Sequence, residues 1–242
     1  MIALHAAAPD HVTTLPVFSG RGLAAATGVN LLAIADPSLA MHPDLKLGWY
    51  LGNRPQGRFR TLSTPIIKHV LEQLGSTRTV FFGASGGGFA AGELSQNFPE
   101  SLALLCNPRL DFRMQPRAAV REYLVHCHSA VSRTPQLRIR AEFVPTALDS
   151  EWNGSPANTI AIIQNTGDRM YHDHQFLPFA QRHADDPSVL HLLRDDGEGH
   201  RHVPRAEPER VITGLAEAES PPAALRELGF RTGIPGGTSA SQ

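Results

Sequence analysis

The sequence is poor in cysteine, in net charge and in long apolar segments, and each shortage excludes a class of protein. Only 2 of the 242 residues are cysteines; Cys106 and Cys127 are too few for a disulfide framework or a zinc knuckle, which predicts free thiols in a reducing compartment. The 22 Lys and Arg nearly balance the 23 Asp and Glu, so no basic field gathers nucleic acid. No apolar run reaches the roughly 18 to 20 residues that span a bilayer. We expect a cytoplasmic protein with no nucleic-acid partner and no membrane span.

The composition is that of a folded chain with one core. Hydrophobic residues make up 41% and charged residues 19% of the sequence, which supplies enough apolar material for a buried centre. A single α/β core grows to roughly 250 residues before splitting. We expect one domain over residues 1–216. The last stretch, 217–242, contains Pro221-Pro222 and Gly236-Gly237 and predicts a disordered tail.

Short apolar runs that end in turn signals predict five buried strands. They lie at residues 30–35, 79–82, 102–106, 159–164 and 189–193. Continuous apolar runs without alternation are typical of a parallel sheet that is covered on both faces. Helical patterns separate the runs, at residues 65–74, 88–98 and 116–131. This alternation predicts a three-layer αβα sandwich with a mostly parallel sheet. The part before residue 30 is short, so a leading strand is expected to be missing or irregular.

A Gly-x-Ser-x-Gly motif connects one predicted strand to a predicted helix. The run 79–82 continues directly into Gly83-Ala84-Ser85-Gly86-Gly87 and then into an Ala-rich helix. A serine at the tip of such a strained turn needs small residues two positions away on each side, because a Cβ there strikes the adjoining strand or helix. The turn exposes the hydroxyl and places the Gly86 N–H at a helix N-terminus, where it stabilises an oxyanion. Ser85 is the predicted nucleophile; the alternatives are a packing turn and a phosphate loop, although no Lys follows the glycines.

An activated serine needs a base and a group that orients the base. Asp168 lies just beyond the run 159–164, and His200 lies just beyond the run 189–193 between flexible glycines. Both positions are at the predicted carboxyl edge of the sheet. His202 is the alternative base, and Asp111, which follows the run 102–106, is the alternative acid.

Here the chain resembles the α/β-hydrolase superfamily, with GASGGGFAA as the most specific segment and a likeness over roughly residues 30–215. Ser, then Asp, then His is the chain order of that family. The resemblance implies Ser85 as nucleophile, His200 as general base, Asp168 as its partner and no cofactor. It also implies an oxyanion hole made by Gly86 and one N–H after the run 30–35. Because Pro37 has no N–H, Ser38 or Asp36 is the expected second donor.

Several longer segments carry a looser resemblance to hydrolase-fold proteins of bacterial surface-polysaccharide and capsule gene sets. They are DPSLAMHPDLKLGWYLG, CNPRLDF, IIQNTGDRMYHDHQFLPF and GEGHRHVP. This second resemblance suggests the transfer of an acyl group to or from a glycan instead of general ester hydrolysis.

Two further residues are candidates for substrate contact. Trp49 offers an aromatic face for a sugar, although isolated aromatics usually pack in a core, and His172 lies close to Asp168 in sequence. The histidines also form three His-x-His pairs: 126 and 128, 172 and 174, and 200 and 202. Such a pair binds metal when it lies on a strand, but 126 and 128 fall in a predicted helix, where alternate residues diverge. We therefore expect no metal site, with a metal-dependent hydrolase as a rival hypothesis.

The main functional prediction is a serine hydrolase that cleaves a carboxylic ester of a small molecule or glycan through an acyl-enzyme. One alternative uses the same residues as an O-acyltransferase that acts on a surface polysaccharide or another glycan. Another is a hydrolase-fold scaffold without catalysis. The sequence predicts neither the acyl group, the acceptor nor the oligomeric state.

Overall fold

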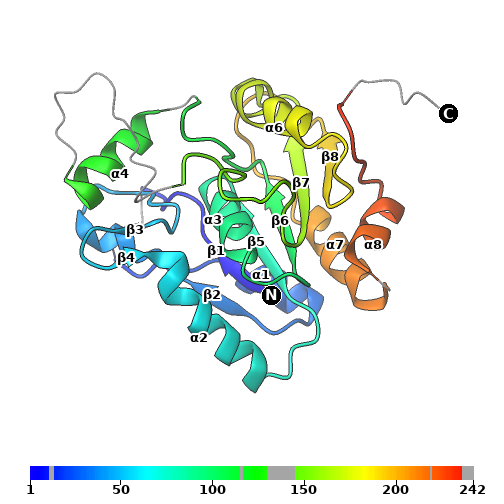
Figure 1. Ribbon diagram of the computed structural model, residues 1–242, viewed down its shortest axis with the longest axis horizontal. Coiled ribbons are helices and arrows are strands. Elements are labelled where there is room, and N and C mark those ends of the chain that lie inside the picture. The colour runs from blue at the N-terminus through cyan, green and yellow to red at the C-terminus, as the bar shows by residue number, and fades with distance from the viewer. Residues whose placement is uncertain (11–13, 115–116, 130–144, 219, 236–242) are drawn as a thin grey trace.

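The computed structural model describes residues 1–10, 14–114, 117–129, 145–218 and 220–235, and its centre is a parallel sheet (Figure 1). Six strands follow the order β2-β1-β5-β6-β7-β8, and every neighbouring pair is parallel. Their bounds are β1 Ile2–Leu4, β2 Leu32–Ile34, β5 Val80–Ala84, β6 Leu102–Cys106, β7 Thr159–Asn165 and β8 Val189–Arg194. A separate antiparallel hairpin pairs β3, Gly52–Asn53, with β4, Gly57–Arg58.

Helices cover the sheet on both faces. The α-helices are α1 Arg21–Thr27, α2 Phe59–Gln73, α3 Gly86–Ser95, α4 Ala118–His128, α5 Arg169–Tyr171, α6 Leu177–Arg182, α7 Ala206–Glu217 and α8 Pro221–Glu227. A 3-10 helix, η1, spans Pro37–Met41, and a π-helix, η2, spans His172–Phe176. Alternate residues of β6 pack into two separate cores: Leu104 lies with residues of α1, α7 and α8, whereas Leu105 lies with residues of α3 and α6. The molecule is therefore a three-layer α/β-hydrolase-like sandwich, as predicted.

The five predicted strands are all present, and within the described residues β1 joins them in the main sheet without having been predicted. β1 lies in the sheet between β2 and β5, with Leu4 paired to Ile34 on one side and to Gly83 on the other. Three residues are too few for a hydrophobic period to be visible. The segment before residue 30 therefore supplies a regular strand beside the one that carries the Gly-x-Ser-x-Gly turn.

The prediction of a disordered tail from residue 217 is wrong for residues 220–235. This segment forms α8, and the side chains of Leu225 and Phe230 are fully buried in the core under α7. Backbone hydrogen bonds in both directions then join Arg231 to His191 of β8. Burial of two large apolar side chains outweighs the proline signal. Residues 236–242 lie outside the described part of the chain.

Within the described residues, no helix combines the length and the apolarity that a membrane span requires.

Candidate active site

Ser85 occupies the sharp turn between β5 and α3 that the sequence predicts. Its backbone has φ 51° and ψ −116°, a left-handed conformation that is rare for a residue with a side chain. The turn is fixed on both sides, because the Ser85 N–H donates to the carbonyl of Cys106 and the Ser85 carbonyl accepts from the N–H of Arg109. A Cβ at Gly83 would lie 2.0 Å from the Gly87 carbonyl oxygen. Glycine at that position is therefore a steric requirement of this turn.

The structure brings the predicted base and acid into direct contact. Nδ1 of His200 lies 2.5 Å from Oδ2 of Asp168, which is 2% exposed. The other carboxylate oxygen accepts the backbone N–H of Tyr171 at 3.2 Å. The Tyr171 ring stacks on the His200 ring, with centroids 4.1 Å apart and planes 28° from parallel. These contacts fix the ring of an otherwise accessible histidine.

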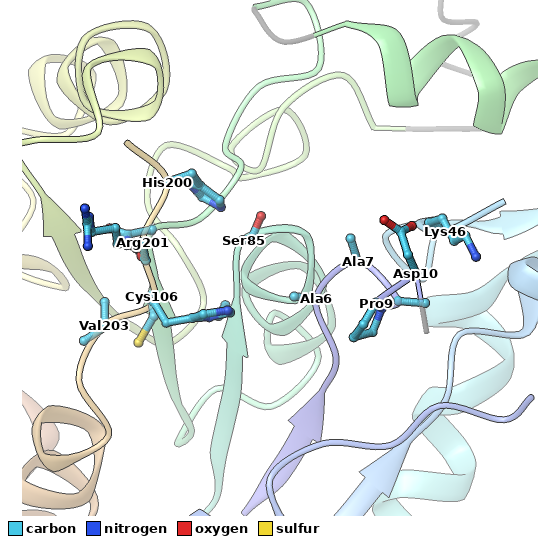
Figure 2. A pocket seen from close by; sticks show the side chains of 14 residues that line it. Ala6, Ala7, Pro9, Asp10, Lys46, Ser85, Cys106, His200, Arg201 and Val203 are labelled. Atoms are coloured by element: carbon cyan, nitrogen blue, oxygen red, sulfur yellow. Dashed lines mark hydrogen bonds between the residues drawn. The ribbon is translucent and has the colours of Figure 1, made fainter. Parts of the chain in front are cut away.

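Ser85 and His200 line one cavity of about 480 Å³ at the carboxyl ends of β1, β5 and β6. In Figure 2 the Ser85 hydroxyl and the His200 ring point into this same space. Because Nδ1 of His200 is hydrogen-bonded to Asp168, Nε2 is the ring nitrogen that is available to the cavity. The other walls come from the segment after β1, from Lys46, from the ends of β5 and β6 and from the segment around His200: Ala6, Ala7, Ala8, Pro9, Asp10, Ala84, Cys106, Asn107, Arg201, His202 and Val203.

The two alternative residues, His202 for the base and Asp111 for the acid, lie in different surroundings. His202 lines the same cavity, but the Asp168 carboxylate contacts His200. Asp111 is buried and binds Arg113 instead, with Oδ2 2.5 Å from the guanidinium and Oδ1 2.8 Å from the backbone N–H. The geometry therefore selects Asp168 over Asp111 as the partner of His200.

The expectation that Ser38 or Asp36 supplies an oxyanion donor is wrong. Ser38 is fully buried; its N–H donates to Asp36 Oδ1 at 2.9 Å and its hydroxyl donates to the Gly52 carbonyl at 3.0 Å. The Asp36 N–H donates to Nε2 of His5 at 3.3 Å. The physical reason is strand order: β1, and not β2, lies next to β5. Gly86 remains in position, since it is the first residue of α3 and its N–H has no acceptor within the helix.

Neither of the two predicted substrate contacts lines this cavity. Trp49 is 1% exposed and packs edge-on against Phe112 and Tyr123, so its face is unavailable to a sugar. His172 pairs with Asp173, at 2.6 Å between Nδ1 and Oδ1, and does not line the cavity described above. Trp49 packs beside the serine turn, where its Nε1 would lie 3.1 Å from a Cβ at Gly86.

The cysteine in the cavity wall does not compete as a nucleophile. Burial raises the pKa of the Cys106 thiol to about 12, so the thiolate is scarce at neutral pH. Among the described residues, no group of three or more His, Cys, Asp or Glu is arranged to hold a metal ion. His126 and His128 lie on α4, as predicted.

Two buried asparagines at the strand ends, Asn107 and Asn165, are not among the residues that the sequence predicts for the site. Both side chains bind the backbone of the segment that carries His200. Their positions in the sequence are the signal that points to them, because Asn107 directly follows one buried apolar strand and Asn165 ends another.

Comparison with known proteins gives a likeness in fold. No family model and no curated protein matches the chain. Among solved structures, it is similar to the capsule O-acetyltransferase of Neisseria meningitidis serogroup A, with a TM-score of 0.56, 14% identity and coverage of 83% of this chain and 80% of that one. The same enzyme in complex with caged gadolinium gives a TM-score of 0.53, again with 14% identity, covering 83% of this chain and 79% of that chain. At this identity the likeness shows the fold.

Proposed function

We propose that this protein transfers an acyl group through a covalent intermediate on Ser85. The observation that carries the proposal is the hydrogen bond between His200 and Asp168 in a cavity that also contains Ser85. A serine hydroxyl is a poor nucleophile until a base takes its proton. His200 is the base, and Asp168 holds its tautomer and stabilises the imidazolium.

The chemistry proceeds in two halves. In the first, Ser85 Oγ attacks the carbonyl carbon of an ester or thioester acyl donor while its proton passes to Nε2 of His200; the leaving group then departs with that proton. In the second, His200 takes the proton of an acceptor hydroxyl, whose oxygen attacks the acyl-enzyme. Collapse of the tetrahedral intermediate breaks the bond to Ser85 Oγ, which recovers the proton.

The oxyanion hole in this proposal combines Gly86 with the segment after β1. Leu4 pairs with Gly83, so the chain beyond Leu4 runs alongside the turn that holds Ser85. The N–H of His5 donates to the Tyr50 hydroxyl, and the N–H of Ala8 donates to the Lys46 carbonyl. Ala6 and Ala7 lie between them and line the cavity. We assign the second donor to a backbone N–H of this pair.

We propose a glycan hydroxyl as the acceptor, which makes the protein an O-acyltransferase. The likeness to capsule O-acetyltransferases supports this alternative better than ester hydrolysis, which was the main prediction from the sequence. Both reactions share the acyl-enzyme. They differ in whether water or a sugar hydroxyl reaches it.

The first test is labelling with a fluorophosphonate followed by intact-mass analysis. Wild type is expected to gain one adduct, and Ser85→Ala none. Ser76→Ala is the matched control, because Ser76 is an exposed serine before the opposite end of β5. A folded wild type that gains no adduct would indicate a scaffold without catalysis.

The second test separates the two acceptors. The protein is incubated with p-nitrophenyl acetate and a series of oligosaccharides that carry free hydroxyls, and mass spectrometry compares acetylated sugar with free acetate. Sugar acetylation that depends on Ser85 supports an O-acyltransferase. Release of acetate alone, at a rate that the sugar does not change, supports a hydrolase.

A further inference from the structure

Asn165, the last residue of β7, is fully buried and binds four backbone groups with one side chain. Its Oδ1 accepts the N–H groups of Gly167 and Asp196, each at 3.0 Å. Its Nδ2 donates to the carbonyls of Gly197 at 2.8 Å and Gly199 at 3.2 Å. The side chain thereby joins the turn before Asp168 to the segment before His200.

Asn107 extends this connection from the neighbouring strand. Its Oδ1 accepts the N–H of Asn165 at 2.7 Å, and its Nδ2 donates to the carbonyl of Arg201 at 2.8 Å. The residues on both sides of His200, Gly199 and Arg201, are therefore held by buried carboxamides. A further backbone bond joins the Gly199 N–H to the Gly167 carbonyl at 3.0 Å.

We propose that Asn165 is a positioning residue that sets the His200 ring relative to Asp168 and Ser85. The inference rests on the proposed function, in which His200 is the base. Only a carboxamide offers two donors and two acceptors of this reach. An aspartate of the same size keeps the acceptors and faces two carbonyl oxygens without a donor.

His200 needs such support because its own segment is weakly constrained. Gly197 and Gly199 both have a positive φ, at 90° and 85°, and the His200 side chain is 39% exposed. Rates of acyl transfer depend steeply on the placement of the base, and a shift of about 1 Å costs up to about a hundredfold. The two asparagines replace the packing that a buried base obtains from its neighbours.

The test compares Asn165→Asp with Asn158→Asp. Asn158 is also buried and directly precedes the other end of β7, where its Nδ2 donates to Ser101 Oγ and its Oδ1 accepts from Gln96. Each substitution removes one amide donor at one end of the same strand. Asn165→Asp is expected to slow fluorophosphonate labelling of Ser85 by at least about tenfold, and Asn158→Asp by less than about twofold.

A second measurement separates positioning from loss of stability. The proton on His200 Nδ1 that binds Asp168 is expected to give a far-downfield ¹H NMR signal, assigned by its absence in His200→Gln. Asn165→Asp is expected to lose or move this signal while the folded protein persists, and Asn158→Asp to keep it. If Asn165→Asp does not fold, Asn107→Asp, which removes the donor to Arg201, is measured in its place with the same expectation.

The outcomes are distinct. Wild-type labelling and an unmoved signal in folded Asn165→Asp overturn the inference and leave the proposed function intact. Equal losses of labelling rate in Asn165→Asp and Asn158→Asp, in proportion to the fall in their unfolding temperatures, also overturn the inference, because they show a purely structural role. If Ser85 of the wild-type protein does not react with the fluorophosphonate, the proposed function itself is contradicted.

Discussion

His200 and Asp168 are 32 residues apart in sequence and form a hydrogen bond of 2.5 Å between Nδ1 and Oδ2. The contact distinguishes two histidines that are two positions apart and line the same cavity. Because the acid is 2% exposed and its other oxygen is held by a backbone N–H, it cannot turn to serve His202 without breaking both bonds. The contact with Asp168, more than the local sequence, therefore distinguishes His200 from His202.

The first prediction concerns this choice of base. His200→Gln is expected to lower the rate of acetyl release from p-nitrophenyl acetate by about a thousandfold or more, because Ser85 loses its proton acceptor. His202→Gln is the matched control and is expected to stay within about threefold of wild type. Steady-state kinetics on both variants, with circular dichroism to confirm folding, decide the matter. The reverse pattern would assign the base to His202.

The sequence was sufficient where a prediction depends on local pattern. The glycines around Ser85 and the polar residues after the apolar runs are read from short segments, and they predict Ser85, Asp168 and His200. Ser85 and His200 line one cavity in the structure, and Asp168 contacts His200. Strand adjacency is a property of the whole sheet. The three residues of β1 carry no visible period, so the sequence predicts the second oxyanion donor after β2, at Ser38 or Asp36.

The surroundings of the Trp49 and Asn165 side chains could not be predicted from local sequence either. Burial of Trp49 follows from packing against Phe112 and Tyr123, which are distant in sequence. The four bonds of Asn165 depend on how two loops meet. In the tail, buried Leu225 and Phe230 outweigh a composition that is typical of disorder.

The second prediction tests the steric requirement of the serine turn. Gly83→Ala is expected to lower the free energy of unfolding by more than about 2 kcal/mol, because its Cβ would lie 2.0 Å from a backbone oxygen that cannot move freely. Gly22→Ala in α1 is the control. Its Cβ meets only the end of the Arg205 side chain, at 3.4 Å, so a gain of about 0.5 to 1 kcal/mol is expected. Urea unfolding of the three proteins measures both changes, and equal stability of Gly83→Ala and wild type would contradict the prediction.

The third prediction concerns stability at acidic pH. Burial alone would raise the pKa of Asp149, but hydrogen bonds from His183 and Arg182 and the charge of Arg182 outweigh it and lower the pKa to about 2. A lowered folded-state pKa gives stability that is present above the unfolded value and is lost as pH falls through the folded one. Asp149→Asn is expected to cost roughly 1 to 2 kcal/mol at pH 7, after allowance for solvent screening. Urea unfolding at pH 7, 5 and 3 should give a smaller difference at pH 3 than at the two higher values. A constant difference would show that the ion pair does not carry the effect.

The fourth prediction concerns Tyr171, whose ring stacks on His200 at 4.1 Å and whose side chain is hydrogen-bonded to that of the buried Arg109. When His200 takes the serine proton it becomes an imidazolium, and an aromatic face stabilises a cation by about 0.5 to 1 kcal/mol at an exposed site. Tyr171→Leu removes the face and is expected to slow labelling of Ser85 by about two- to fivefold.

Tyr171→Phe separates stacking from the contact with Arg109. It keeps the ring and removes the hydroxyl, so the rate of Ser85 labelling is expected to stay at the wild-type value if stacking is the operative contact. Equal losses of labelling rate in the Phe and Leu variants would assign the effect to the hydroxyl and Arg109 instead. Wild-type labelling rates in both variants would show that Tyr171 acts on the site only through its backbone N–H to Asp168, which neither substitution removes.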